Sequence, residues 1–193
     1  MTTLTTAQAT TLKNFIAADG TLSQIPKTTD GAYAIVAALN VPVTTFWVWQ
    51  TQTNVSDIYN NILWANFTPN APASGAGTDA ANYMLFNQGK QFNLQILIGG
   101  GSPTLATSKV NIIAGLQDSL TGLLRINGVA VPAGGGWPAV QLSIQRNPTV
   151  LEKLFAATTA TTVSTGVGTQ ANPATLIIEG GLQPNDILNL WAV

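Results

Sequence analysis

The sequence lacks cysteine and histidine altogether. Without cysteine the chain has no disulfide, no thiol nucleophile and no zinc–thiolate cluster; without histidine it has no imidazole base, no Ser-His-Asp triad and no histidine metal ligand. Its eight Asp and Glu residues mostly fall at expected helix caps or loops, such as Asp19, Asp30 and Asp57. We therefore predict no catalytic residue, no metal and no cofactor, and a protein that is not an enzyme. A hydrolase whose carboxylates meet only in the folded chain is the enzymatic alternative.

Charge is also scarce. Charged residues make up 8% of the 193 residues, whereas soluble domains carry roughly 25%. The seven Lys and Arg residues are scattered singly, so no basic face is available to displace phosphate counterions, and we expect no sequence-specific nucleic-acid binding. Thr, Asn, Gln and Ser supply the polar surface instead. Such a surface repels further copies only weakly, which favours a subunit of an assembly.

Long apolar runs are missing as well. The charge-free stretch 31–56 is broken by Asn, Pro, Thr and Gln, whereas a membrane helix needs about 20 continuous apolar residues. The N-terminal segment "MTTLTTAQATTLKNF" has neither the basic start nor the apolar core of a signal peptide. We expect a protein of the cytosol or of an assembled particle, with no membrane partner.

Hydrophobic spacing predicts three helices in the first part of the chain. The first is capped by Thr5 or Thr6, the second by Asp30 and the third by Asn54. Residues 44–53 between the second and third are predicted to be extended. The apolar positions that share a helical face are Leu12, Phe15 and Ile16; Ala32, Ile35, Val36 and Leu39; and Val55, Ile58, Tyr59, Ile62 and Leu63.

The rest of the chain mixes helices with strand signals. "QFNLQILIGGGSPT" is either a short strand or the end of a helix, and residues 109–120 and 139–156 have helical patterns. Asn127-Gly128 predicts a tight hairpin turn. We therefore predict a mainly α single domain spanning 1–193. It has a helical-bundle body (1–122 and 138–156), an inserted β-hairpin or extended loop (123–137), and a tether with a C-terminal β-containing arm (157–193).

Two segments are candidates for contacts with other chains. The hairpin is apolar on both strands, and glycines 134–136 are expected to let it flex or approach a neighbour. Trp191 near the end of the arm could anchor an interface or pack on its own domain. The candidate interface residues are Asn127, Gly128, Val129, Trp137, Leu176, Ile177, Ile178, Leu190 and Trp191. The glycine loops at 99–109 and 166–171 lack the spacing of phosphate-binding and dinucleotide-binding motifs.

Six segments together resemble one protein family. They are "LTTAQATTLKNFIAADGTLSQIP", "DGAYAIVAALN", "FWVWQT", "LEKLFA", "NPATLIIEG" and "LQPNDILNLW". The family comprises small virion-structural proteins from the morphogenesis genes of tailed bacteriophages. The resemblance is strong at both ends of the chain and weak between them. Relative to the family, the loop after "LEKLFA" is longer and the hairpin around Asn127-Gly128 is an insertion.

The resemblance implies a neck or head–tail connector (adaptor) subunit in the neck and tail region of the virion, assembled in the host cytoplasm. Its expected partners are the portal protein, tail and neck proteins and its own copies, in a closed ring of about twelve. DNA would pass through the ring without being gripped, and the arm carrying Trp191 would reach the portal or an adjacent subunit. The alternatives are a capsid decoration protein, another tail protein of the same class of phage, and an unrelated hydrolase.

Overall fold

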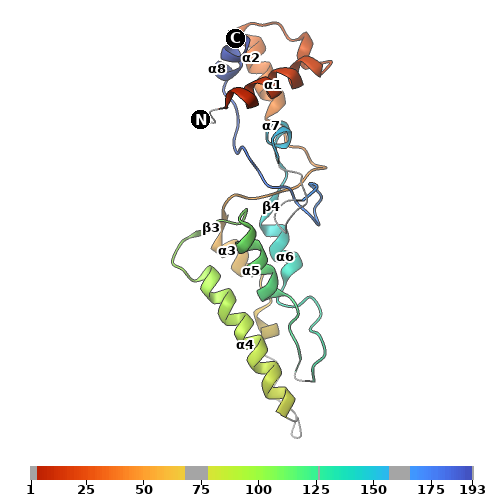
Figure 1. The fold of residues 1–193 in the computed structure, drawn as a ribbon, viewed down its shortest axis with the longest axis vertical. Coiled ribbons are helices and arrows are strands. Elements are labelled where there is room, and N and C mark those ends of the chain that lie inside the picture. The colour runs from red at the N-terminus through yellow and green to blue at the C-terminus, as the bar shows by residue number, and fades with distance from the viewer. Residues whose placement is uncertain (1–3, 68–77, 126, 157–165, 193) are drawn as a thin grey trace. The chain divides into compact units, whose positions relative to one another are not determined.

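The computed structural model describes residues 4–67, 78–125, 127–156 and 166–192, and these are mainly helical (Figure 1). The prediction of a mainly α protein is confirmed. The single domain spanning 1–193 stays a prediction, and within it the described residues group into two compact units. Unit 1 contains the described residues of 1–48, 147–160 and 165–193, and unit 2 contains those of 49–146. Each unit encloses a hydrophobic cluster of its own.

Unit 1 begins with two helices that the sequence predicts. Thr5 caps α1 (Thr6–Ala18) through a capping box with Gln8, as expected from the sequence. Helix α2 (Thr29–Leu39) starts one residue after Thr28, whose side chain accepts a hydrogen bond from the Gly31 N–H. Asp30, the predicted cap, instead lies in the first turn of α2, where its charge favours the helix dipole.

A short 3₁₀ turn, η1 (Leu22–Gln24), connects these helices. The exposed Asp19 carboxylate accepts hydrogen bonds from the backbone N–H groups of Leu22 and Thr21, each at 2.9 Å. These bonds favour the charged carboxylate and lower the pKa of Asp19 below its ordinary value, the Leu22 bond contributing most. The turn is therefore stabilised by an ionised Asp19.

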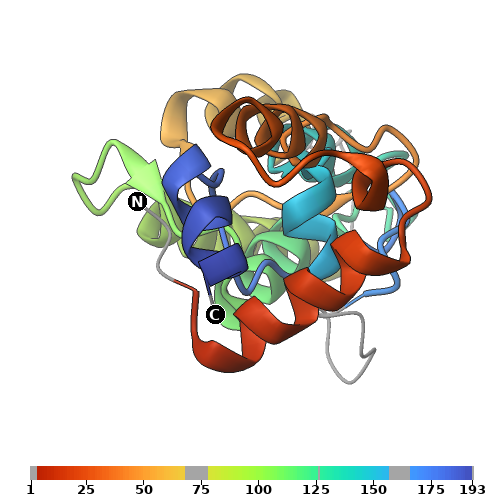
Figure 2. The ribbon, with the colours of Figure 1, turned by 90° about the horizontal axis from the view of Figure 1, so that it is seen from above.

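The C-terminal segment completes the core of unit 1. Helices α7 (Val150–Leu154) and α8 (Pro184–Ala192) lie with α1 and α2 in one group (Figures 1 and 2). Their shared cluster consists of Leu12, Ile16, Leu22, Ala32, Ile35, Leu39, Leu151, Phe155, Ile178, Leu182 and Ile187. The expectation that the arm reaches away from its own chain is corrected for Ile178, Leu182 and Ile187, which belong to this cluster, whereas Val167 and Ile177 are exposed. Residues 157–165 of the predicted tether lie outside the described residues.

A buried carboxylate fixes this C-terminal segment to α7. Glu152, which is 2% exposed, accepts hydrogen bonds from the N–H groups of Thr149 (2.9 Å) and Gly180 (3.0 Å). The β structure predicted for the C-terminal arm is represented by an isolated parallel bridge between Val48 and Ala174. Both ends of the chain therefore contribute backbone and side-chain contacts to unit 1.

Unit 2 is built mainly from α3 (Val55–Asn60), α4 (Thr78–Ile98), α5 (Val110–Leu120) and α6 (Trp137–Ser143), with the 3₁₀ turn η2 (Trp64–Phe67). The predicted helix at 109–120 is confirmed as α5, and the segment from 91 forms the end of α4 rather than a strand. The pattern at 139–156 is interrupted between α6 and α7. The buried cluster comprises Trp49, Ile58, Ile62, Phe67, Leu94, Ile113, Leu116, Leu120, Leu123, Val140 and Ile144.

Within the described ranges, four very short strands accompany these helices. β1 (Val48–Trp49) pairs with β4 (Gln145–Arg146), and β2 (Thr53–Asn54) pairs antiparallel with β3 (Thr104–Leu105). The Thr53 and Thr107 hydroxyls share a buried hydrogen bond of 2.8 Å beside β2. In the described part of the chain, no helix combines the length and hydrophobicity that a membrane crossing requires.

The predicted hairpin is present, with Leu124 and Ala130 forming an antiparallel bridge. The Arg125 N–H donates to the Val129 carbonyl at 2.8 Å, and Gly128 adopts a φ of 78°, which glycine tolerates best. Residue 126 lies outside the described residues.

The glycines that follow the hairpin do not act as a flexible link, so that expectation is corrected. The Gly135 N–H donates to the Leu120 carbonyl at 2.7 Å. A Cβ on Gly136, which has a φ of 98°, would lie 2.6 Å from the Asn61 carbonyl oxygen. These glycines are needed because the backbone approaches its own neighbours closely there.

Candidate functional site: the outer face of helix α4

The hairpin is held on α4 by one fully buried side chain, Asn87. Its Nδ2 donates to the Leu124 carbonyl at 2.7 Å, and its Oδ1 accepts from the Leu124 N–H at 3.0 Å. Nearby, Gly128 lies so close to Tyr83 of α4 that an added Cβ would be 2.8 Å from the phenol oxygen. The hairpin therefore packs on its own chain, whereas its sequence suggested cover from a neighbouring subunit.

The inner face of α4 packs on α5. Leu94 is fully buried, and the Leu97 side chain fills the space that a Cβ on Gly115 would need. Lys90 Nζ reaches Asp118, donating to its carbonyl oxygen at 2.5 Å and approaching Oδ1 at 3.2 Å. The positive charge of α4 is thus paired on the α5 side of the helix.

The opposite face of α4 carries exposed apolar residues. Ala81, Leu85, Gly89, Phe92 and Ile96 follow one another at spacings of four, four, three and four residues, which places them within an arc of about 80° on a helix. Leu85 is 64% exposed, and Phe92 and Ile96 are each 61% exposed. We call these five residues the α4 stripe. No Lys, Arg, Asp or Glu belongs to it.

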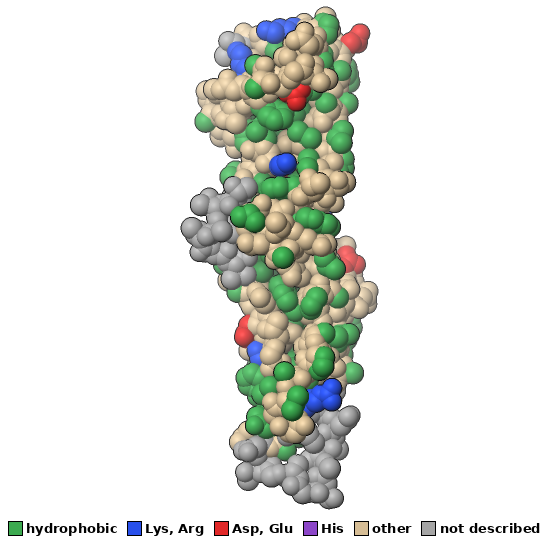
Figure 3. Space-filling model, turned by 90° about the vertical axis from the view of Figure 1, so that its right-hand side faces the viewer, with side chains coloured by type: hydrophobic (Ala, Val, Ile, Leu, Met, Phe, Trp, Pro, Cys, Tyr) green, Lys and Arg blue, Asp and Glu red, His purple; other side chains and the backbone are tan. Residues whose placement is uncertain are grey.

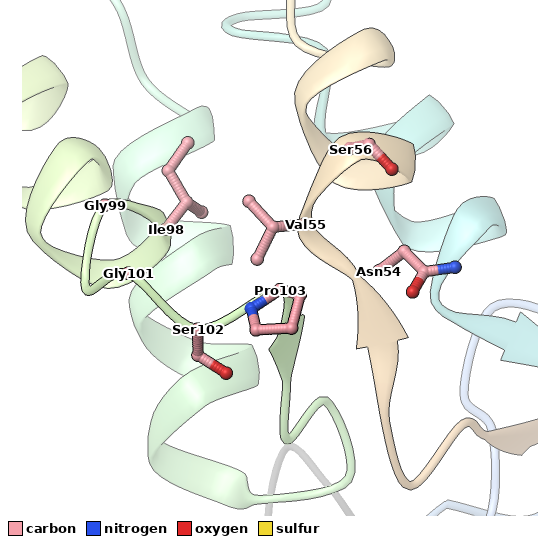
Figure 4. Close-up of a pocket in the computed structure, with 8 residues that line it drawn as sticks. All are labelled: Asn54, Val55, Ser56, Ile98, Gly99, Gly101, Ser102 and Pro103. Atoms are coloured by element: carbon pink, nitrogen blue, oxygen red, sulfur yellow. The ribbon is translucent and has the colours of Figure 1, made fainter.

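A shallow groove adjoins the C-terminal end of the stripe. In Figure 4, Val55 of α3 faces Ile98 at the end of α4, with Pro103 beside them. This hollow has a volume of about 510 Å³ and is lined by Asn54, Val55, Ser56, Ile98, Gly99, Gly101, Ser102 and Pro103. A second hollow of about 440 Å³ shares three of these residues and adds Tyr59, Trp64, Gln91 and Gln95.

The groove contains hydroxyls and amides but no charged lining residue. Ser102 Oγ donates to the Thr104 carbonyl at 2.8 Å, so it participates in the local turn. A serine nucleophile needs an adjacent base, and neither hollow is lined by one. Among the described residues there is also no group of three or more Asp, Glu, His or Cys side chains that could hold a metal ion. The groove can therefore offer apolar contact and neutral hydrogen bonds.

The structure places the predicted interface residues in both units. In unit 2, Asn127 and Val129 are exposed at the hairpin, whereas Gly128 and Trp137 are half-buried, with Trp137 packed on the core. In unit 1, Ile177 is 65% exposed. Leu176 is half-buried, and the other C-terminal candidates pack on or within the unit 1 core: Ile178, Leu190 and Trp191.

The α4 stripe was missed by sequence reasoning. A usable signal was the spacing of Leu85, Phe92 and Ile96 by seven and four residues, which is typical of one helix face. Searches of family models, curated proteins and solved structures find no match to the chain. The resemblance to phage structural proteins accordingly depends on the six sequence segments alone.

Proposed function

We propose that the chain is a non-enzymatic structural subunit of a tailed-phage virion that forms the head–tail connector ring between portal and tail. The observation that carries this proposal is the scarcity of charge, since charged residues make up 8% of the 193 residues, and the α4 stripe adds an exposed apolar surface for contact with another molecule. Figure 3 agrees with this, since few Lys, Arg, Asp and Glu side chains are visible among the described residues on the face shown.

An exposed apolar surface in water favours contact with another molecule. Single exposed apolar residues are common on monomeric proteins, whereas a contiguous apolar strip marks a contact with another molecule. Low charge also means that many identical copies can crowd together with little repulsion. Both properties suit a subunit that is present in many copies in one assembly.

The place in the virion comes from the resemblance. The residues that carry it include Trp47 and Trp191, which lie in unit 1 together with α1, α2 and α8. The portal and the tail and neck proteins are the partners that the resemblance implies. We assign the ring to the portal–tail junction on that basis.

Negative-stain imaging of the purified chain mixed with purified portal tests this function. We expect rings seated on the portal, of matching symmetry. Trimers, or binding to capsid hexamers in place of portals, would identify a decoration protein and overturn the connector proposal. Particles that show no assembly with any virion protein would overturn the structural function as a whole.

A further inference from the structure

Four positions of the α4 stripe are arranged symmetrically about its middle, with a small side chain at one end and a large one at the other. The stripe is Ala81, Leu85, Gly89, Phe92 and Ile96, and its midpoint lies between Gln88 and Gly89. If a second copy of α4 lies antiparallel across a two-fold axis at that midpoint, Ala81 of one copy faces Ile96 of the other. Leu85 then faces Phe92. Small residues meet large ones at both ends, as a self-complementary interface requires.

Gly89 is suited to be the position at which two copies of α4 cross. It lies in the interior of a 21-residue helix, where glycine is less favourable than alanine. It is exposed, and nothing lies within 4 Å of the place where a Cβ would be, so its own chain does not require a glycine there. A missing side chain at the middle of the stripe lets the backbone of a second helix come close.

Charge favours a second copy over a charged partner. Lys90 is directed to Asp118 and away from the stripe. The stripe is bordered instead by exposed amides: Asn82, Gln88, Asn93 and Gln95. Amides both donate and accept hydrogen bonds, so two identical borders can satisfy each other. The stripe and these bordering amides carry no charge that would select a partner of opposite sign.

From these observations we propose that α4 is a self-association surface, on which two copies of the chain pair antiparallel about a two-fold axis at Gly89. This contact goes beyond the proposed connector function and does not depend on it. A two-fold contact joins two copies and closes no ring, so a ring needs a further, head-to-tail contact elsewhere. The stripe covers only part of the ~800 Å² per partner of a standard interface, so the dimer is reversible.

The first test measures oligomeric state. Sedimentation of the full chain over a range of concentrations should show a monomer–dimer equilibrium. The double variant Leu85→Gln, Phe92→Gln should weaken it at least tenfold, while the control Tyr33→Gln, at a site of α2 in unit 1 that is 61% exposed, should leave it unchanged. A monomer at every concentration, or equal effects of both variants, would overturn the proposal.

A second variant separates pairing from folding. Gly89→Leu introduces a better helix former at an exposed position, so the monomer should be as stable as the wild type or more so. The leucine would nevertheless occupy the crossing point, so dimerisation should be lost. Retained dimerisation with Gly89→Leu would contradict the close approach of the two helices.

Cysteine cross-linking tests the antiparallel geometry, because the chain has no native cysteine. Gly89→Cys should form a disulfide-linked dimer under oxidation. Ala81→Cys should not, since its two copies would be about 22 Å apart along the helices. A mixture of Ala81→Cys and Ile96→Cys chains should cross-link. Self-cross-linking of Ala81→Cys would indicate parallel helices and overturn the proposed geometry. Rings on the portal without α4 cross-links would overturn the self-association of α4 and leave the connector function standing.

Discussion

Replacing Asn87 by leucine removes both hydrogen bonds that hold the hairpin on α4. The side chain is fully buried, and its partners are the carbonyl and the N–H of one residue, Leu124. Leucine fills a similar space but neither donates nor accepts. The backbone groups of Leu124 would lose their partners while the contact between hairpin and helix remained crowded.

The expected loss of docking free energy follows from the carbonyl and the N–H of Leu124. A buried backbone group left without a partner costs about 1–3 kcal/mol. Because Leu124 is half-buried, water can recover part of this, and we expect a total loss of about 2–3 kcal/mol for the docking of the hairpin. At 1.4 kcal/mol per factor of ten, the opening equilibrium of the hairpin should rise about 30- to 100-fold.

Hydrogen–deuterium exchange of the peptide covering residues 123–131 measures this opening directly. The Val131 N–H, bonded to the Leu123 carbonyl at 2.8 Å, should exchange faster in Asn87→Leu by that factor. Asn93→Leu is the matched control, because it makes the same substitution at an exposed position of α4. If both variants exchange at the wild-type rate, Asn87 does not hold the hairpin and the reasoning is refuted.

Three further predictions concern both units. Ile187→Ala should destabilise unit 1 by about 2–4 kcal/mol, because Ile187 is fully buried; an unchanged urea midpoint would restore the interpretation of the C-terminal segment as a free arm. Gly136→Ala should lower the melting temperature more than Gly20→Ala, since an added Cβ meets the Asn61 carbonyl at the first site and nothing within 4 Å at the second; equal melting temperatures would count against the packed loop. The pKa of Asp19 is lowered in the folded chain, so its stabilisation is present above the unfolded-state pKa of 3.8 and is lost as the pH falls through the lower folded value. Asp19→Asn should remove this part of the acid sensitivity, and identical acid titrations of the two proteins would contradict it.

The helices that the sequence predicts well have one apolar face each. In α2, for example, Ala32, Ile35 and Leu39 share a single buried stripe. Helix α4 is different, because Leu94 belongs to a buried face and Phe92 to an exposed one on the other side. Apolar residues on two opposite faces cancel the one-sided pattern, so no helix could be predicted over residues 78–90.

The errors arise from contacts between distant parts of the chain. A Thr/Gly tract before residues 166–192 suggested an arm, and nothing in the local sequence shows that Ile178 and Leu182 bury against helices formed by the first forty residues. The glycines at 134–136 similarly suggested flexibility, whereas their close neighbours are Leu120 and Asn61. Local composition predicts a turn or a break, but it does not reveal which surface will cover it.

The candidate site could likewise be predicted only where the local sequence determines the structure. The Asn127-Gly128 turn was predicted because two residues specify it locally. Its attachment to Asn87, forty residues earlier, could not be predicted from that turn. The exposure of Leu85 and Phe92 also depends on which face of α4 meets α5, and this is decided by packing in three dimensions.

The position of the chain in an intact particle tests the central claim most directly. A short epitope tag at one terminus, labelled with gold and imaged on the virions that we propose contain the chain, would report that position. If the chain is the connector subunit, the label will be confined to the portal–tail junction. Label spread over the capsid surface, or particles that lack the chain, would contradict it.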